Sequence, residues 1–514
     1  MLKTLTLGLA LAAASAPALA QVAQPYDIVI LEGRVIDPET GLDAIRNVAI
    51  RDDEIALITE DPIEGELVIN ATGLVVAPGF IDLHAHGQTL LAGRVQALDG
   101  VTTALELEAG VYPVADFYAD AAEEGRTINY GAAVNWAAAR NAVLTGAEPD
   151  EAGALHAHED GPDWRYTPAS AEQTATVLER VRDGLNEGAL GIGVLLGYVP
   201  GSGRSEYYAL HELAAAYDVP SFTHARYLSN LEPDSSLEGF QEMIAVSAAT
   251  GADMHISHLN SISLRDINVI RPMIEAAQAH GVNITVEAYP YGAGSTSIGT
   301  ALFEGADWQA RFGGIEKSDF TLAGTPLSDE AFDRLQAEAP DTTIVVHFLD
   351  IENDPADRAI LSQSILFPGG AIASDGGDWM VNGEVLPAET WPLPDNADSH
   401  PRSAGTFSRF LREYVREREA ISLSEALAKT SLIPARILAD AVPQMRRKGR
   451  LQAGMDADIV IFDLATVSDQ ATYEAPARTS TGYSYVIVGG TPVVREGRLD
   501  TEVRPGRPVR RPTQ

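Results

Sequence analysis

The chain has 514 residues, of which 45% are hydrophobic and 21% charged, and this balance is typical of a folded globular protein. Its 73 acidic and 36 basic residues give a formal net charge of −37, so phosphate backbones and anionic lipid headgroups are poor partners. The chain contains no cysteine, which excludes disulfides, thiol nucleophiles and thiolate metal ligands.

Residues 1–20 have the pattern of a secretory signal peptide. Lys3 precedes the apolar run Leu5–Ala14, and Ala18-Leu19-Ala20 offers the small residues that a signal peptidase reads. The apolar run is too short to span a membrane, and no later stretch qualifies. We therefore expect a periplasmic or secreted protein that begins near Gln21 and inserts no segment into a membrane.

The two ends of the remaining chain predict short β-strands. Runs rich in Val, Ile and Leu are broken by turns at Asp27–Leu31, Asn47–Ile50, Ile55–Ile58, Asp458–Phe462 and Tyr485–Val488. We expect one small β-sandwich domain formed by both termini, from residues 25–77 and 446–503. The Arg- and Pro-rich segment Arg504–Gln514 is expected to be a loosely attached end.

Residues 78–445 alternate apolar strands with helical stretches. The helical stretches are rich in Ala, Leu and Glu and include Ser170–Asn186, Ser205–Asp218, Arg265–His280 and Ser424–Asp440. This alternation predicts an α/β fold with a parallel sheet, and at this length a (β/α)₈ TIM-type barrel inserted into the terminal β domain. Catalytic side chains are then expected where the barrel strands end.

The first barrel strand ends in two histidines. Phe80–Leu83 is an apolar run, and His84 and His86 follow two residues apart, so both imidazoles face the same side. Paired neutral imidazoles suit a divalent transition metal such as zinc.

The second strand carries two acidic residues. Glu106 and Glu108 alternate with leucines in Gly100–Glu108, so their carboxylates share one face. Inside a barrel at least one of them needs a cation or a proton, because an unpaired buried charge is costly. Glu108 lies nearer the strand's carboxyl end and is our candidate bridging metal ligand, with Glu106 as its support or substitute. The alternative is that both face solvent on an edge strand.

Three later strands also end in candidate ligands. His224 ends the run from Val219, His258 follows Met254–Ser257, and Asp375 follows Ala371–Ser374. His255 lies on the opposite pleat from His258 and is expected to be a packed histidine. Five strands in chain order thus end in candidate ligands: two histidines on the first, then a glutamate, a histidine, a histidine and an aspartate.

That order resembles the amidohydrolase superfamily, and further segments resemble its D-aminoacylase (N-acyl-D-amino-acid deacylase) branch over nearly the whole mature chain. These segments are Gly188–Gly191, Tyr289–Tyr291, Ser374–Gly376, His400–Phe407, Tyr414–Glu417, Gly449–Leu451 and Gly454–Asp458. The resemblance implies that His84, His86 and Asp375 hold one metal, and that His224 and His258 hold the other.

This chain departs from the branch at the bridge between the metals. Members of the branch often use a cysteine after the second strand, where this chain has Ala109, and other superfamily members use a carboxylated lysine. Only Lys3, Lys317, Lys429 and Lys448 occur here, and none closes an apolar strand. A glutamate is therefore expected to bridge two zinc or other divalent ions, unless the site holds only one.

The resemblance implies a hydrolase of a small-molecule amide, most simply an N-acyl amino acid. Asp375 would move the proton from the attacking water to the leaving nitrogen. The candidate substrate-binding residues are Tyr198, Arg226, Asn260, His400 and Arg402, and Asn260 stands where the branch has a lysine. Each arginine is expected either to pair with a substrate carboxylate or to form a structural ion pair, and His400 either to contact the substrate or to brace the Asp375 loop. Two alternative functions stay open: hydrolysis of a cyclic amide, ester or lactone, and a catalytically silent binding protein. Assembly into a homo-oligomer is left open as well.

Overall fold

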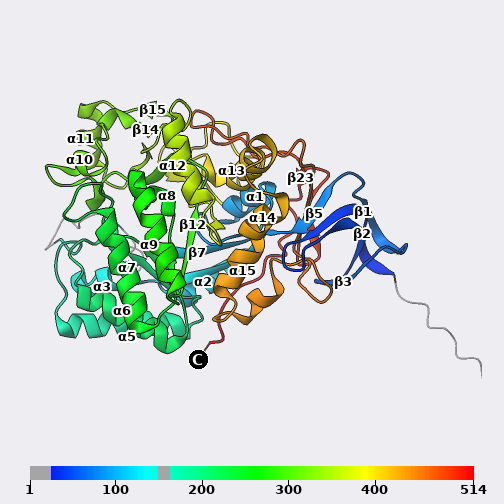
Figure 1. Cartoon of the computed structure of the whole chain (residues 1–514), viewed down its shortest axis with the longest axis horizontal. Helices are drawn as coiled ribbons and strands as arrows, with labels where there is room; N and C mark the ends of the chain where they lie inside the picture. Colours follow the sequence, from blue (N-terminus) through cyan, green and yellow to red (C-terminus); the bar gives the residue numbers. More distant parts are fainter. Residues whose placement is uncertain (1–24, 149–154, 156–162, 514) are drawn as a thin grey trace, which may run out of the picture.

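The computed structural model describes residues 25–148, 155 and 163–513. The predicted signal peptide lies outside these residues. At the centre of the described chain, eight parallel strands form a nearly closed barrel in chain order (Figure 1). They are β6 (Phe80–Asp82), β7 (Val101–Val111), β8 (Asn129–Asn135), β9 (Ile192–Leu195), β10 (Ser221–His224), β11 (Met254–Ile256), β12 (Ile284–Ala288) and β17 (Ala371–Ile372).

The barrel closes just beyond the ends of its first and last strands. The Asp375 amide donates to the His84 carbonyl at 2.7 Å, and the Gly87 amide donates to the Gly376 carbonyl at 3.0 Å. Asp82 adds a second tie, because its Oδ1 accepts from the backbone amides of His84 at 3.1 Å and Ser374 at 2.9 Å. The seam therefore fixes the two segments that carry His84, His86 and Asp375.

Helices follow most strands and cover the barrel. They are α1 (Leu90–Leu98), α2 (Val114–Glu124), α3 (Trp136–Thr145), α5 (Ala171–Asn186), α6 (Arg204–Tyr217), α7 (Ser236–Thr250), α8 (Leu259–Ser263), α9 (Ile267–Ala279), α12 (Pro355–Ile365), α13 (Arg402–Phe410), α14 (Leu423–Leu427) and α15 (Ile433–Leu438). Helix α5 illustrates the local logic. Ser170 and Gln173 form a capping box, and Val177, Val181 and Leu185 recur every fourth residue on its buried face.

The strand-rich ends of the chain meet in one nine-stranded sheet, as counted over the described residues. Its strands are β1 (Tyr26–Asp37), β2 (Leu42–Arg51), β3 (Glu54–Thr59), β4 (Gly65–Asn70), β5 (Val75–Pro78), β20 (Ile459–Phe462), β21 (Tyr483–Val488), β22 (Thr491–Arg495) and β23 (Arg498–Leu499). β5 pairs with both β1 and β20, which joins the N-terminal strands to the C-terminal strands. The predicted barrel with an extra β domain is confirmed, and the β domain is one continuous hydrogen-bonded sheet.

A small subdomain between β12 and β17 was not predicted. Strands β13 (Ala293–Ser297), β14 (Phe320–Leu322), β15 (Thr325–Pro326) and β16 (Thr343–His347) form an antiparallel sheet in the order β13-β16-β14-β15. Helices α10 (Trp308–Arg311) and α11 (Asp329–Glu338) lie beside it (Figure 1). Its core contains Phe303, Phe320, Phe332 and Ile344.

The prediction for the C-terminal segment is wrong. Val509 is buried with Leu105 of β7 and Phe222 of β10, and its amide donates to the Tyr130 carbonyl at 2.7 Å. Tyr118 Oη donates to the Val509 carbonyl at 2.8 Å. The end of the chain thus packs over the barrel where the strands begin. Composition alone suggested a loose end, but the backbone of this segment pairs with the barrel.

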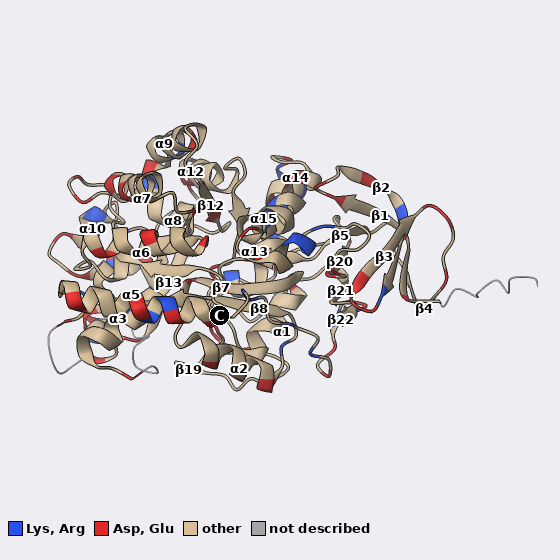
Figure 2. Cartoon of the chain, turned by 90° about the horizontal axis from the view of Figure 1, so that it is seen from below, with Lys and Arg blue, Asp and Glu red and all other residues tan. Residues whose placement is uncertain are grey.

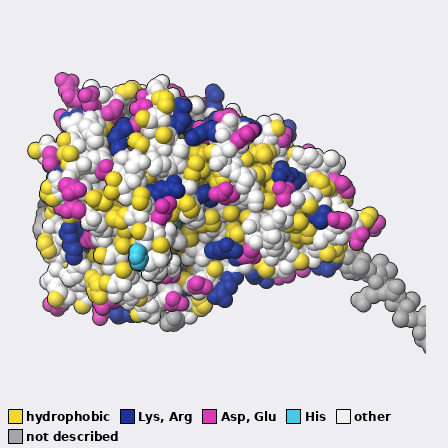
Figure 3. Space-filling view, viewed as in Figure 1, with side chains coloured by type: hydrophobic (Ala, Val, Ile, Leu, Met, Phe, Trp, Pro, Cys, Tyr) yellow, Lys and Arg dark blue, Asp and Glu magenta, His cyan; other side chains and the backbone are white. Residues whose placement is uncertain are grey.

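The surface is acidic overall but mixed in detail. Acidic residues lie on most of the outer helices (Figure 2), and on the face in Figure 3 they are interspersed with Lys and Arg. No helix among the described residues has both the length and the apolar character needed to cross a bilayer.

Candidate metal centre

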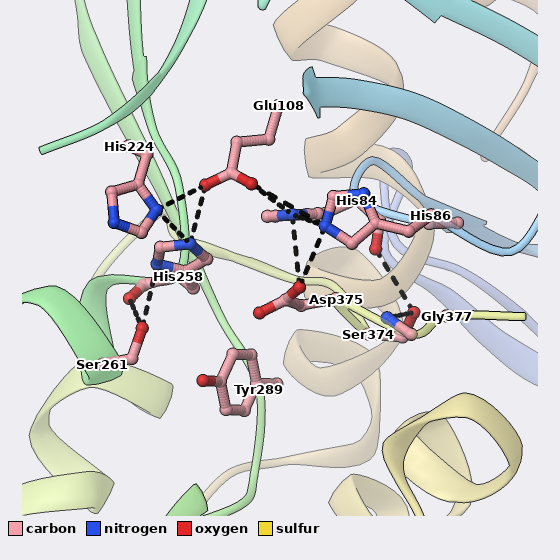
Figure 4. A network of polar contacts seen from close by, with 12 residues as sticks. His84, His86, Glu108, His224, His258, Ser261, Tyr289, Ser374, Asp375 and Gly377 are labelled. Carbon is pink, nitrogen blue, oxygen red and sulfur yellow. Dashed lines mark hydrogen bonds and ion pairs between the residues drawn. The ribbon is translucent and has the colours of Figure 1, made fainter. Parts of the chain in front are cut away.

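All six predicted metal-binding residues converge where the barrel strands end (Figure 4). The ring nitrogens of His84 and His86 lie 3.1 Å apart, and both face Asp375 Oδ1, at 3.4 Å and 3.2 Å. His224 Nδ1 and His258 Nε2 form a second pair, 3.2 Å apart. The sequence therefore predicted correctly which side chains meet.

Glu108 lies between the two histidine pairs. Its Oε2 is 3.1 Å from His84 Nε2 and 3.7 Å from His86 Nε2. Its Oε1 is 2.7 Å from His258 Nε2 and 3.0 Å from His224 Nδ1. Each oxygen thus serves one group of ligands, which is the arrangement that a carboxylate adopts when it bridges two cations.

Glu106 has a different place. Its Oε2 is 2.8 Å from His86 Nδ1, on the ring edge that faces away from the other candidate ligands. Only 6% of Glu106 and 4% of Glu108 is exposed, so the alternative of a solvent-facing strand is wrong. Glu106 thus contacts the outer nitrogen of the His86 ring, whereas Glu108 lies between the two histidine pairs.

Glu287 on β12 is a support that the sequence did not single out. Its Oε1 lies 2.5 Å from His84 Nδ1, and its Oε2 lies 3.1 Å from His255 Nε2. His255 in turn contacts Thr285 Oγ1 at 2.8 Å through Nδ1. A partner on Nδ1 fixes the tautomer of His84 and leaves Nε2 with its lone pair towards the centre. The sequence did offer a sign of this role: Glu287 is an acidic residue within an apolar strand, two residues before the Tyr289–Tyr291 segment.

The donor set fits a metal because its charges and lone pairs need a cation. Four carboxylates are buried here with a single guanidinium, a net charge of −3 with neutral histidines: Glu106, Glu108, Glu287 and Asp375 beside Arg402. Nitrogen lone pairs that face each other at 3.1–3.2 Å cannot share a hydrogen bond unless one is protonated. A set of imidazole nitrogens and carboxylate oxygens without sulfur is suited to zinc and related divalent ions.

The pKa values of His86 and Asp375 reflect the negative charge of the surrounding carboxylates and the positive charge of Arg402. Burial lowers the pKa of His86, but Glu106 and Asp375 outweigh it and raise that pKa to about 10. For Asp375, burial acts to raise the pKa, yet Arg402 and His84 hold it well below its usual range. This pocket therefore stabilises positive charge at its centre and keeps Asp375 ionised.

Two ligand segments have unusual backbone conformations. His258 has φ of 29° and Asp375 has φ of 53°, both in the left-handed region that non-glycine residues rarely adopt. Such conformations persist where the surrounding structure imposes them, and they are common at functional sites. Here the turn after each strand directs the side chain inward.

Arg402 and His400 line the cavity in front of the ligands. Arg402 Nη1 is 2.9 Å from Asp375 Oδ2, and its guanidinium lies 4.7 Å above the Tyr289 ring. His400 Nδ1 accepts from the Arg402 amide at 3.0 Å. Burial, followed by the charge of Arg402, lowers the pKa of His400 well below its usual value, so the ring is neutral.

Tyr198 lies at the junction of the ligands and the cavity. Its ring centroid is 4.8 Å from that of His224, and its Oη is 3.2 Å from Thr296 Oγ1. Burial and the nearby Glu108 raise its pKa, so the phenol stays protonated and can donate a hydrogen bond.

Arg226 is not placed to bind a substrate, contrary to the prediction. Its Nε and Nη2 donate to the two carboxylate oxygens of Glu242 at 2.8 Å and 2.9 Å, and Nη1 donates to Ser202. Because all its donor groups are engaged, no fork remains for a ligand carboxylate. The alternative of a structural ion pair holds for Arg226, with Glu242 as its partner.

Asn260 is likewise a structural residue. Its Oδ1 accepts from the Tyr289 amide at 3.3 Å, and its Nδ2 donates to the Tyr291 carbonyl at 3.4 Å. The side chain braces the backbone after β12 and does not line the cavity, so the predicted substrate contact is corrected.

Comparisons with known proteins show which family this chain is related to. A family model described as "Amidohydrolase family" matches residues 67–360 and 260–494. The chain is 30% identical to N-acyl-D-glutamate deacylase of Alcaligenes xylosoxydans xylosoxydans, over 95% of this chain and 97% of that protein. It is 26% identical to the D-aminoacylase of the same organism, over 92% of this chain and 95% of that protein.

Solved structures share the fold. The N-acyl-D-glutamate deacylase of Bordetella bronchiseptica, complexed with zinc and a phosphonate inhibitor, superposes with a TM-score of 0.74 at 24% identity, covering 95% of this chain and 100% of that chain. A D-aminoacylase structure has a TM-score of 0.75 at 22% identity, with the same coverage. Another describes a binuclear metal centre, with one-metal activation and second-metal attenuation.

Proposed function

Because this chain belongs to the amidohydrolase family and to its D-aminoacylase branch, we propose that it is a zinc-dependent deacylase of N-acyl-D-amino acids. The family makes the chain a metal-dependent amide hydrolase. What we propose in addition is that the metal is zinc and that the substrates are N-acyl-D-amino acids. The observation that carries it is the position of Glu108, with one carboxylate oxygen on each histidine pair.

The residues divide into two metal sites and a proton carrier. His84, His86 and Asp375 would hold one ion, His224 and His258 the other, and Glu108 both. A bound zinc ion polarises the scissile carbonyl and makes water a better nucleophile near neutral pH. Asp375, kept ionised by Arg402, accepts a proton from the attacking water and delivers it to the leaving nitrogen.

Other side chains orient the substrate. Arg402 lines the cavity beside Asp375, and its guanidinium can pair with the carboxylate of the amino-acid part. Tyr198 keeps its proton and can donate to the oxygen of the carbonyl as negative charge develops there. His400 lies on the same wall and holds the start of the Arg402 helix in place.

The test is a substrate panel on zinc-loaded protein. We expect amine release from N-acetyl-D-amino acids, faster than from their L-enantiomers, and loss of that activity after treatment with a chelator. Zinc should restore it. No release from any N-acyl amino acid, or ring opening of hydantoins or lactones in its place, would refute the deacylase assignment.

Export is a separate part of the proposal. Lys3, the apolar run Leu5–Ala14 and Ala18-Leu19-Ala20 support cleavage after Ala20 and delivery to the periplasm or medium. N-terminal sequencing of protein from the extracytoplasmic fraction should begin at Gln21, and a mature chain that keeps Lys3 would contradict this.

A further inference from the structure

The cavity in front of the candidate metal centre has an unusual wall. Its volume is ≈ 350 Å³, and one side is formed by the small sheet between β12 and β17. On that side the lining residues include five with hydroxyl groups, and they are Ser295, Thr296, Ser297, Thr321, Ala323, Thr343, Ile344 and Val345.

The sheet register explains why hydroxyls face the cavity. Ser297 pairs with Thr343, and Ser295 pairs with Val345, which also pairs with Thr321. Directly opposed residues share one face of an antiparallel sheet, and alternate residues take the other. The other face carries Phe320, Ile344 and Val346, which are buried in the core of the subdomain. Thr296 pairs with Ile344 on that face and reaches the cavity beside Tyr198, so the register accounts for Ser295, Ser297, Thr321 and Thr343 only.

These hydroxyls are available to a ligand. Within the described chain, no side-chain hydrogen bond engages Ser295, Ser297 or Thr343. All three are partly exposed, so they retain access to the cavity. A wall of serine and threonine hydroxyls can both donate to and accept from an uncharged polar group.

Positive charge in this cavity is limited to one residue. Among the described residues that line it, Arg402 is the only Lys or Arg, and the carboxylates of Asp378 and Asp398 line it as well. Residues 149–154 and 156–162, which are not described, contain no Lys or Arg in their sequence. One guanidinium can pair with one substrate carboxylate and leaves a second without a partner.

A second cavity beside the candidate metal centre has a different character. A smaller cavity of ≈ 60 Å³ adjoins His224, His258 and Asp375. It borders Ser295 and Thr296 of the larger cavity, and the rest of its lining is mostly apolar and aromatic, with Leu228, Leu302, Phe303, Phe312 and Phe348. This cavity suits a short acyl group, which leaves the hydroxyl-lined cavity with Arg402 for the amino acid.

We propose that the hydroxyl-lined cavity selects N-acyl amino acids with an uncharged polar side chain, such as Asn or Gln, over those with an acidic one. This inference rests on the proposed deacylase function. The α-carboxylate pairs with Arg402, and the side chain bonds to the hydroxyls of β13 and β16. An acidic side chain would enter a cavity that already contains the carboxylates of Asp378 and Asp398, for which the described residues supply no ion pair with Lys or Arg. Such a penalty against the wrong substrate is an effective source of specificity.

The test uses substrates that differ only in charge. We expect kcat/KM for N-acetyl-D-asparagine to exceed that for N-acetyl-D-aspartate at least about tenfold, with the same direction for the glutamine and glutamate pair. Equal or greater kcat/KM for the acidic substrates would overturn the inference and leave the deacylase function standing. Absence of hydrolysis for all four, with other N-acyl amino acids also inert, would refute both.

A variant tests whether the selectivity arises from the hydroxyl-lined side of the cavity. Ser297→Lys adds a cation to the cavity from an edge strand and should raise the aspartate-to-asparagine ratio of kcat/KM at least about tenfold. Ser318→Lys makes the same change at an exposed position of the same subdomain, outside the cavity lining, and should leave the ratio unchanged. An unchanged ratio in Ser297→Lys, or an equal rise in the control, would show that the side chain does not bind there.

Discussion

The two ends of the barrel differ in the side chains found there: charged and polar groups gather at one end, and apolar groups are packed at the other. Where the strands end, histidines and carboxylates converge, and His258 and Asp375 adopt left-handed backbone conformations. Where they begin, the C-terminal segment covers the barrel, and Val509 is buried among apolar side chains. The closed end supplies stability, and the open end can therefore hold uncompensated charge that a cation satisfies.

The largest effect should follow a change at the open end. Asp375→Asn keeps the shape of the side chain but removes the charge that receives the proton, so kcat should fall at least ~10³-fold. Asp378→Asn is the matched control, since Asp378 lines the same cavity but bonds to Thr89. The control should keep most of its activity, and both variants should keep the wild-type circular dichroism spectrum. Substantial turnover by Asp375→Asn would refute its role as proton carrier.

A pair of glutamate variants separates the bridge from its support. Glu108→Gln should retain only about one equivalent of zinc, because the amide keeps one oxygen and its nitrogen cannot bind a metal, so one of the two histidine groups loses its carboxylate oxygen. Glu106→Gln should still bind two equivalents, with affinity weakened ~10–100-fold, as expected when a partner of a ligating histidine is lost. Metal analysis after dialysis measures both, and the reverse pattern would make Glu106 the bridge.

At the closed end the sensitive group is a buried neutral histidine. His211 Nδ1 donates to the Tyr207 carbonyl at 2.8 Å, and Nε2 contacts Ser221 Oγ at 2.9 Å, where β10 begins. Burial lowers the pKa of His211 to about 4. In the unfolded chain a histidine titrates near 6.5, so the unfolded state binds the extra proton between these values. The contribution of His211 to the free energy of unfolding is therefore fully present above pH 6.5, and it is lost as the pH falls towards 4.

The expected size of this acid loss is about 3 kcal/mol between pH 7 and 4. His211→Gln cannot titrate, so its unfolding free energy should fall by about 3 kcal/mol less than that of the wild type over the same range. Denaturant titrations at the two pH values give the comparison. Parallel losses in the two proteins would show that His211 contributes nothing to acid sensitivity.

The smallest expected effect concerns the cover of the closed end. Val509→Ala removes buried methyl groups and should lower the free energy of unfolding by about 2 kcal/mol. Because this residue lies at the opposite end of the barrel from Asp375, kcat at 25 °C should not change. Unchanged stability, or a loss of kcat without a loss of stability, would contradict the division between the two ends.

The sequence predicted the site correctly where the position of a side chain depends on one strand alone. Residues two apart at a strand end share a face, so His84 with His86 and Glu106 with Glu108 could be placed from their spacing. The ligand set at the other strand ends followed from the barrel topology, in which every strand ends at the same mouth.

What the sequence could not give depends on partners far along the chain. Arg226 resembles a substrate-binding residue until Glu242 is seen to occupy its fork, and Glu287 becomes relevant only when His84, 203 residues away, lies against it. The tail was predicted from composition, which does not reveal that Val509 pairs with Tyr130. In each case the deciding contact joins elements that the local pattern treats separately.

The most direct measurement is anomalous X-ray scattering at the zinc absorption edge from crystals of the zinc-loaded protein. The account predicts two peaks at the mouth of the barrel: one among His84, His86, Asp375 and Glu108, the other among His224, His258 and Glu108. Peaks elsewhere, or none at this mouth in protein that hydrolyses its substrate, would contradict it.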